Sequence, residues 1–210
     1  MKDFRYLQLG ASIYVPSNRN DLISIVKGLK FKARSIIFCT EDSILDSEVS
    51  QGIYNIGEML PHINPLDKTL FFIRVRNLNV LKEVLTLPYI HRVTGFVIPK
   101  VTHDNFSEYM DLLPENHKFM IMPTLETKEV FSFNKMEELV NVFEPYKKSI
   151  LTIRIGGNDL MNIIGIRRPK SRTLYETPIG NVISNLISIF KPEGYNLTSP
   201  VYEFLYDNEI

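Results

Sequence analysis

Short apolar segments rich in β-branched and aromatic residues recur along the chain. They are Ser12–Pro16, Ser35–Cys39, Thr69–Val75, Gly95–Val101, Phe119–Leu125, Leu151–Ile155 and Leu197–Phe204. Several of them are apolar at nearly every position, which is typical of parallel strands that are covered on both faces. Strict alternation of apolar and polar residues, the pattern of a half-exposed antiparallel sheet, is rarer. We therefore predict seven strands of a largely buried, parallel sheet.

Apolar residues spaced three and four positions apart predict helices between these strands. Asp21–Leu29, Met136–Phe143 and Pro178–Phe190 each carry one apolar stripe with this spacing. Asn20-Asp21 is placed to cap the first helix, and Lys191-Pro192-Glu193-Gly194 is expected to end the last. Strands that alternate with helices indicate a parallel α/β fold, either a closed barrel or a doubly wound layer.

The length of 210 residues fits one domain, and no repeat, low-complexity tract or linker indicates a second. A complete eight-stranded barrel usually takes about 250 residues. We therefore expect residues 1–210 to form a single α/β domain, a (β/α) barrel of the TIM type that is incomplete at its C-terminus. Unpaired strand edges attract other chains, so we also expect a homo-oligomer.

Charge and cysteine content exclude several classes of protein. The 24 Lys and Arg residues balance 24 Asp and Glu residues, and the densest basic stretch, residues 167–172, is short. A nucleic-acid partner normally requires a basic excess. The single cysteine, Cys39, excludes an intramolecular disulfide and favours a reducing compartment. Neither a signal peptide nor an apolar stretch of about 18 residues is present, so we expect a cytoplasmic protein that binds no membrane.

Polar residues gather where the predicted strands end, and in parallel α/β proteins this end carries the chemistry. The sequence segments at five successive strand ends are Thr40-Glu41-Asp42, Arg74-Val75-Arg76, Pro99-Lys100, Leu125-Glu126-Thr127 and Gly156-Gly157-Asn158-Asp159. Carboxylates, an arginine and a lysine are therefore expected at one end of the sheet.

Glu126 and Asp159 are the candidate metal ligands. Mg²⁺ prefers oxygen ligands and usually takes only one or two protein carboxylates. Such an ion can chelate the oxygens of a 2-keto acid or its enolate and stabilise the developing negative charge. Arg74 could hold a carboxylate through two parallel hydrogen bonds. Gly156-Gly157 would allow the backbone to approach a bound ligand closely, because neither residue has a Cβ.

Each of these residues also has a purely structural interpretation. A carboxylate at a strand end often caps a helix or pairs with a nearby arginine, and Arg76 and Arg154 fit structural and functional roles equally. Gly156-Gly157 lacks the GxGxxG and Walker patterns. Cys39, at the end of an apolar strand, is typical of a buried, inert thiol. The four histidines, His62, His91, His103 and His117, show no metal-ligand spacing.

The strand-end words, taken in order, resemble the citrate lyase beta subunit and HpcH/HpaI aldolase superfamily. The likeness is closest to the branch of carbon–carbon lyases of TIM-barrel fold encoded with tellurite-resistance genes. It extends from about Ser12 to the C-terminus. The matching words are Ile13-Tyr14-Val15-Pro16, Glu41-Asp42, Ile73-Arg74-Val75, Ile98-Pro99-Lys100, Leu125-Glu126-Thr127 and Gly156-Gly157-Asn158-Asp159-Leu160.

The resemblance implies a Mg²⁺-dependent lyase or aldolase that acts through a metal-stabilised enolate on a small oxo acid or an acyl-CoA-like thioester. It implies that Glu126 and Asp159 are metal ligands and that Arg74 binds the substrate carboxylate. Glu41 and Asp42 match the acidic pair that holds metal-bound water, and Lys100 matches a supporting residue.

This chain departs from the family pattern in three places. Gly10 aligns where the citrate lyase type has an arginine, and Cys39-Thr40 replaces the first two residues of an Asp-Leu-Glu-Asp word. Family members also continue into an eighth strand. The alternative to an enzyme is a non-catalytic subunit that binds a metabolite or scaffolds a stress-response complex. The missing final barrel unit favours this alternative, and the intact Arg, Glu and Asp set favours the enzyme.

Overall fold

The computed structural model describes residues 6–115 and 118–201, which divide into two compact units. The N-terminal unit comprises residues 6–99, 108–115 and 118–122, and the C-terminal unit comprises residues 100–107 and 123–201. The expectation that residues 1–210 form one domain stays a prediction.

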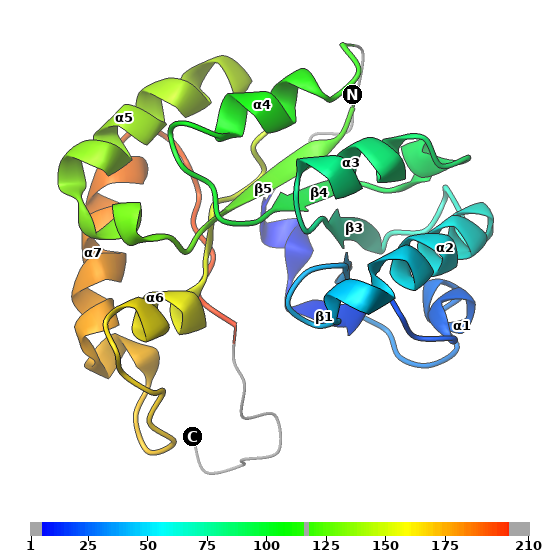
Figure 1. Ribbon diagram of the computed structural model, residues 1–210, viewed down its shortest axis with the longest axis horizontal. Helices are drawn as coiled ribbons and strands as arrows, with labels where there is room; N and C mark the ends of the chain where they lie inside the picture. The colour runs from blue at the N-terminus through cyan, green and yellow to red at the C-terminus, as the bar shows by residue number, and fades with distance from the viewer. Residues whose placement is uncertain (1–5, 116–117, 202–210) are drawn as a thin grey trace. The chain divides into compact units, whose positions relative to one another are not determined.

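The described residues contain six strands, which follow one another in the sheet in chain order. They are β1 (Ser12–Pro16), β2 (Ser35–Cys39), β3 (Leu70–Arg74), β4 (Gly95–Ile98), β5 (Met120–Leu125) and β6 (Arg154–Ile155). Every described pairing is parallel. Sequential parallel strands separated by helices confirm the predicted α/β fold, a (β/α) barrel of the TIM type that is incomplete among the described residues (Figure 1).

The predicted sixth and seventh strands are corrected by the structure. Regular pairing with β5 begins only at Arg154, because Thr152 and Ile153 bond to residues 196–198 instead. Ile153 donates its N–H to Asn196 O at 2.7 Å and accepts from Thr198 N at 2.9 Å. Leu197 therefore forms an isolated parallel bridge with Ile153 rather than a strand. Residues 202–204 of the predicted seventh strand lie outside the described residues.

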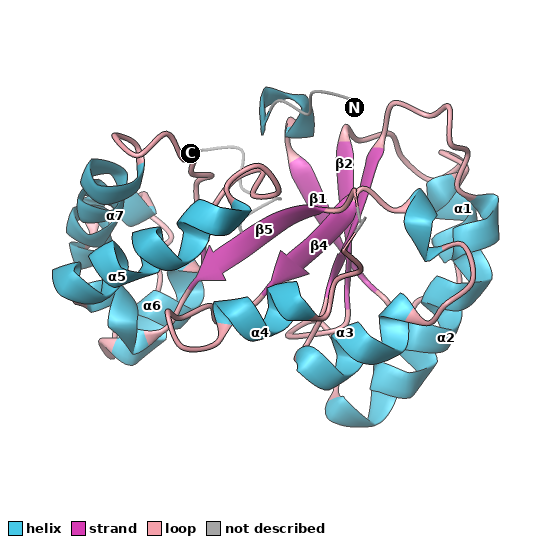
Figure 2. Cartoon of the chain, turned by 90° about the horizontal axis from the view of Figure 1, so that it is seen from above, coloured by secondary structure: helices cyan, strands magenta, loops and turns pink. Residues whose placement is uncertain are grey.

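The helices are α1 (Leu22–Val26), α2 (Val49–Met59), α3 (Leu78–Leu85), α4 (Phe106–Asp111), α5 (Phe133–Phe143), α6 (Gly157–Ile163) and α7 (Pro178–Phe190). In the N-terminal unit, α1, α2 and α3 lie on one side of β1, β2, β3 and β4 (Figures 1 and 2). In the C-terminal unit, α7 packs against α5 and α6. No helix among the described residues is both long and apolar enough to span a membrane.

The predicted helix ends are partly confirmed. α7 has the predicted bounds, and Gly194, with φ of 81°, follows its last turn as expected of a stop signal. α1 is shorter than predicted and ends before Gly28, whose φ is 68°. Asp21 occupies the N-cap of α1 but makes no capping hydrogen bond. Its carboxylate binds Arg19 at 2.7–2.8 Å instead, and this contact lowers the pKa of Asp21.

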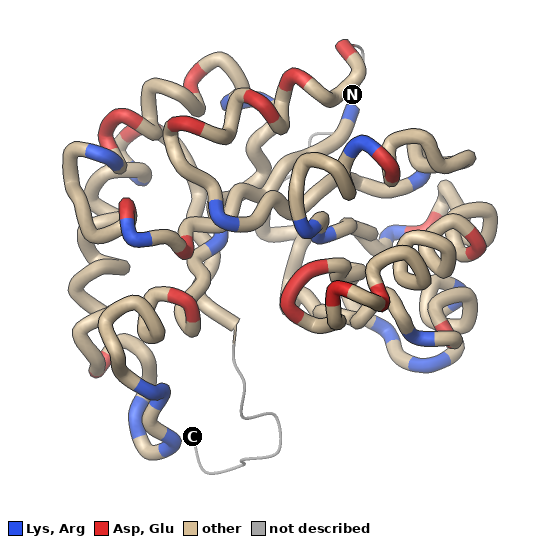
Figure 3. The backbone as a smooth tube through the Cα atoms, viewed as in Figure 1, with Lys and Arg blue, Asp and Glu red and all other residues tan. Residues whose placement is uncertain are grey.

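The strands whose sequences are almost entirely apolar are buried along their whole length. All five residues of β2 and all five of β3 are buried, including Phe38 and Phe72, which have no exposed surface. Burying each such ring contributes about 1.5–3 kcal/mol. β1 differs, since only Val15 is buried there. Charged residues of both signs are spread along the helices and loops of both units (Figure 3).

The short helix Leu174–Glu176, just before α7, generates a prediction about pH. The Glu176 carboxylate accepts the Thr173 N–H at 2.7 Å and the Thr173 hydroxyl at 2.8 Å. These bonds lower the pKa of Glu176, the backbone one most strongly. The two hydrogen bonds therefore stabilise the folded protein fully at pH values above the ordinary glutamate pKa of about 4.3. This stabilisation is lost as the pH falls through the lower pKa that Glu176 has in the folded protein. We expect an NMR titration of Glu176 with a midpoint below the ordinary glutamate value of about 4.3. A midpoint at or above that value would contradict the cap.

Candidate functional site

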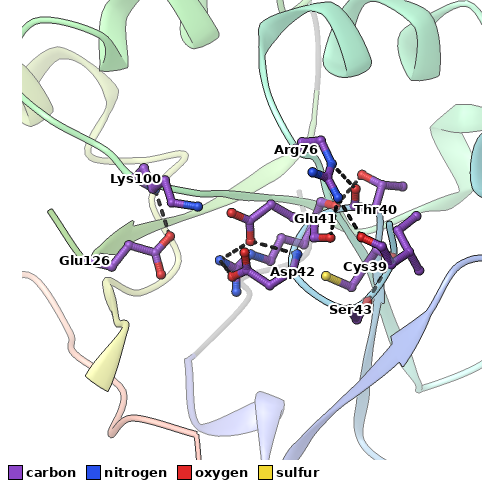
Figure 4. A network of polar contacts seen from close by, with 10 residues as sticks. Cys39, Thr40, Glu41, Asp42, Ser43, Arg76, Lys100 and Glu126 are labelled. Carbon is purple, nitrogen blue, oxygen red and sulfur yellow. Dashed lines mark hydrogen bonds and ion pairs between the residues drawn. The ribbon is translucent and has the colours of Figure 1, made fainter. Parts of the chain in front are cut away.

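Glu126 directly follows β5 and is buried, with 3 % of its surface exposed. Its Oε1 accepts a hydrogen bond from the Lys100 backbone N–H at 2.9 Å (Figure 4). A buried carboxylate is costly unless charges or hydrogen bonds compensate it. This amide supplies part of that compensation and fixes the direction of the carboxylate.

Lys100 adopts an unusual backbone conformation to make this contact. Its φ is 50°, in the left-handed region that costs a non-glycine residue about 1–2 kcal/mol. Asn105 stabilises the turn, because its amide donates to Lys100 O at 3.0 Å and accepts from Thr102 N at 2.9 Å. Strain of this kind concentrates at functional sites. The supporting role of Lys100 stays a prediction, and the hydrogen bond from its backbone N–H to Glu126 is consistent with that role.

Gly156 packs directly against the side chain of Glu126. A Cβ at this position would lie 2.3 Å from Glu126 Oε2 and 2.4 Å from Glu126 Cβ. Gly156 also donates its N–H to Leu125 O at 3.0 Å. The glycine is therefore required for the buried position of Glu126. Gly157 begins α6, and a Cβ there would lie 2.9 Å from Pro200. Ligand binding by this pair stays a prediction.

Asp159 lies in the first turn of α6, three residues after Gly156. It is partly exposed, and Leu160 N donates to Gly156 O in the same turn. No group of three or more His, Cys, Asp or Glu within residues 6–115 and 118–201 is arranged to hold a metal ion. Mg²⁺ needs no such group, because it commonly keeps several waters and binds one or two carboxylates. Buried Glu126 and partly exposed Asp159 fit that requirement in donor type.

Two further polar residues share the face of the sheet that carries Glu126. Thr124 pairs in register with Arg154, and side chains two positions apart on a strand point to the same face. Thr124 and Arg154 are buried, and the Thr124 hydroxyl has no hydrogen-bond partner in the described part of the chain. Sequence reasoning missed Thr124 and left Arg154 open. The signal that could have found them is their two-residue spacing from Glu126 and Gly156.

In the N-terminal unit the structure brings Arg74, Glu41 and Asp42 together. Cys39 pairs in register with Arg74, so the residues that follow β2 start beside this arginine. The NH2 nitrogen of Arg74 forms ion pairs with the carboxylates of Glu41 and Asp42, the latter at 3.2 Å. Glu41 and Arg74 are buried. The guanidinium also lies over the ring of Tyr14, 5.9 Å from its centroid.

Arg76 contacts the backbone of the same loop. It donates hydrogen bonds to the carbonyl oxygens of Thr40 and Glu41 (Figure 4). It also donates to the carbonyl oxygen of Ile44 and pairs with the Asp46 carboxylate. The sequence left open whether Arg76 is structural or functional. These contacts connect it to the loop that carries Glu41 and Asp42.

The surroundings of Cys39, His103 and Arg168 are also defined. Cys39 is buried, and its thiol is free. His103 contacts Lys135, Asp104 and Glu138 in a partly exposed ion cluster, and His117 lies outside the described residues. Arg168 donates to Val201 O at 2.7 Å.

Comparisons with known proteins agree with this architecture. The family model of the carbon–carbon bond lyases of the TIM-barrel fold matches residues 3–210. A comparison with curated proteins gave no match.

Solved structures of CitE, the citrate lyase beta subunit of Mycobacterium tuberculosis, are similar in fold. The complex with magnesium and acetate is 15 % identical and covers 97 % of this chain and 79 % of its own, with a TM-score of 0.69. The complex with oxaloacetate and magnesium is 15 % identical, with coverage of 93 % and 80 % and a TM-score of 0.67. RipC from Yersinia pestis is also 15 % identical, with coverage of 93 % and 77 % and a TM-score of 0.65. The match across residues 3–210 shows that this chain belongs to the carbon–carbon bond lyase family of TIM-barrel fold, as the resemblance to citrate lyase beta predicted.

Proposed function

We propose that this protein is a Mg²⁺-dependent carbon–carbon lyase or aldolase that acts through an enolate on a small oxo acid or acyl thioester. The observation that carries the proposal is the Glu126 carboxylate, which is buried, oriented by the Lys100 amide and closely flanked by Gly156. A carboxylate buried at a strand end is suited to a cation. Family membership supports carbon–carbon chemistry as the reaction class.

Glu126 and Asp159 would hold the ion, and their oxygen donors are of the type that Mg²⁺ prefers. When bound, Mg²⁺ would supply positive charge that stabilises negative charge on the substrate oxygens. CitE, which shares the fold, has been crystallised with magnesium and oxaloacetate, and this supports an oxo acid as substrate class.

Arg74 would bind the substrate carboxylate. Its planar guanidinium has five N–H donors, which suit a carboxylate better than the single ammonium of lysine. Glu41 and Asp42 both approach the NH2 nitrogen of Arg74, so they hold the guanidinium plane in one orientation. A positioned binding group limits substrate motion before the carbon–carbon bond breaks.

The first test compares Mg²⁺ binding with oxaloacetate binding by isothermal titration. Glu126→Gln keeps the shape of the side chain and removes its charge, so we expect Mg²⁺ affinity to fall at least about tenfold. Arg74→Lys keeps a positive charge and loses the planar fork. It should leave Mg²⁺ affinity unchanged and weaken oxaloacetate binding by about 1.5–3 kcal/mol, roughly ten- to a hundredfold.

Exposed Glu137→Gln in α5 and Arg92→Lys near β4 are the matched controls and should change neither affinity. Normal Mg²⁺ binding by Glu126→Gln would remove the metal assignment, and normal oxaloacetate binding by Arg74→Lys would remove the substrate assignment. Metal-dependent binding without cleavage of oxo acids or acyl thioesters would favour a non-catalytic metabolite-binding subunit.

The contact between Gly156 and Glu126 gives a second test. In Gly156→Ala the added Cβ would lie 2.4 Å from Glu126 Cβ, which belongs to the stem of the side chain and must shift as a whole. We expect a loss of Mg²⁺ affinity of about tenfold or more. Gly57→Ala in α2 is the control, because its Cβ would meet its nearest neighbour, Leu87, at an ordinary 3.5 Å. Equal Mg²⁺ affinity in the two variants would show that Gly156 does not position a ligand.

We also propose self-association, because β1 stands at the end of the strand order and Ile13 on it is 39 % exposed. Light scattering at several concentrations should give a mass above that of the monomer. A substitution of Ile13 by Lys should lower that mass, since edge charges oppose strand pairing. A monomeric mass at high concentration would contradict the proposal.

A further inference from the structure

The loop after β2 is held by the Arg76 side chain in addition to backbone hydrogen bonds. Arg76 Nε donates to Thr40 O at 3.1 Å, and its NH2 donates to Glu41 O at 2.8 Å and to Ile44 O at 2.7 Å. Its NH1 pairs with the Asp46 carboxylate at the exposed end of the same loop. One guanidinium thus binds both ends and the middle of residues 40–46, and its contacts with Thr40 and Glu41 are drawn in Figure 4.

An arginine is required for this arrangement. Thr40 and Glu41 are buried, and buried backbone carbonyls need donors. Three separate guanidinium nitrogens contact the loop here. The ammonium of lysine is a single point with three rotatable donors and cannot reproduce that spread.

Arg74 is joined to the same loop from the other side. Thr40 donates both its N–H and its hydroxyl to Arg74 O, at 3.0 Å and 2.9 Å. Glu41, the next residue, pairs with the Arg74 guanidinium. Arg76 binds the carbonyls of these same two residues. A displacement of the loop would therefore move Glu41 relative to Arg74.

We propose that Arg76 is a positioning residue for oxo-acid binding. It holds the backbone of residues 40–46 so that Glu41 and Asp42 orient the Arg74 guanidinium. This inference rests on the proposed function for the role of Arg74. It adds that the binding group is oriented through hydrogen bonds from the Arg76 guanidinium to backbone carbonyl oxygens, as well as by the ion pairs of Arg74.

The test uses Arg76→Lys, with Arg92→Lys as the matched control. Arg92 also donates to loop carbonyls in the N-terminal unit, those of Pro61 and Ile63, but it does not contact residues 40–46 in the described structure. Two measurements are made on the full chain. The first is oxaloacetate affinity at saturating Mg²⁺. The second is the rate at which a disulfide reagent labels Cys39, a buried thiol immediately before Thr40 that needs no ligand to report loop opening.

We expect Arg76→Lys to speed Cys39 labelling and to weaken oxaloacetate binding, each by about tenfold, and Arg92→Lys to change neither. A double-mutant cycle then separates positioning from general destabilisation. In a Glu41→Gln background, Arg76→Lys should cause a much smaller further loss of affinity, because the interaction through which it acts is already weakened.

The outcomes are distinguishable. Faster labelling with unchanged affinity, or a full and additive loss in the Glu41→Gln background, would overturn the positioning role. A Cys39 labelling rate equal to that of Arg92→Lys would show that Arg76 does not hold residues 40–46 in place. If the parent protein binds no oxaloacetate, the proposed function fails, and faster labelling would then leave Arg76 as a structural residue. If Arg76→Lys does not fold, Asp46→Asn removes only the exposed contact and should shift both measurements in the same direction by a smaller factor.

Discussion

The burial of charge at the ends of parallel strands is the constraint on which the rest of the site depends. An ionised side chain leaves water at a cost of several kcal/mol unless opposite charges or hydrogen bonds replace its hydration. Glu126, Glu41 and Arg74 are all buried, and the surrounding backbone supplies much of what they need. The left-handed turn at Lys100 aims an amide at Glu126, and Gly156 leaves the space that this carboxylate fills. The left-handed backbone of Lys100 is unfavourable by itself, and a glycine packed against a side chain, as Gly156 is, is uncommon. Both are explained by the buried charge of Glu126.

Continuous apolar segments predicted the strands, since a strand covered on both faces leaves no position for polar residues. β2 and β3 follow this rule at every position. β1 deviates because a strand at the end of the order is half exposed, and its five-residue apolar pattern does not reveal that position. β6 is shortened by bonds from Thr152 and Ile153 to residues more than forty positions later, and such long-range pairing has no local signature. The end of α7 was predictable because Gly194 provides its signal within the sequence itself.

The same contrast applies to the site. Residue type and position after a strand were enough to select Glu41, Asp42, Arg74 and Glu126 as candidates. They did not reveal what each side chain touches, because Arg74 and Arg76 look alike in the sequence and differ only in their partners. Arg74 pairs with the carboxylates of Glu41 and Asp42, whereas Arg76 mainly contacts backbone carbonyls and pairs with one exposed carboxylate, that of Asp46. Thr124 went unnoticed because a threonine in a β-branched strand is unremarkable until its hydroxyl is found buried without a partner.

The charges around Arg74 give a physical reason why the binding of an anionic ligand would depend on a metal in the proposed function. Arg74 carries one positive charge, and Glu41 and Asp42 together carry two negative charges close to it. An oxo-acid carboxylate that reaches Arg74 would therefore meet repulsion from these two carboxylates as well as attraction to the guanidinium. In a partly buried setting, where the effective dielectric constant is about 20, one unit charge at 4 Å is worth roughly 4 kcal/mol. A divalent cation reverses that balance, because it adds two positive charges to whichever oxygens bind it. In the proposed function, Arg74 and its two acidic partners would therefore favour a ligand whose own negative charge is partly offset by a bound cation.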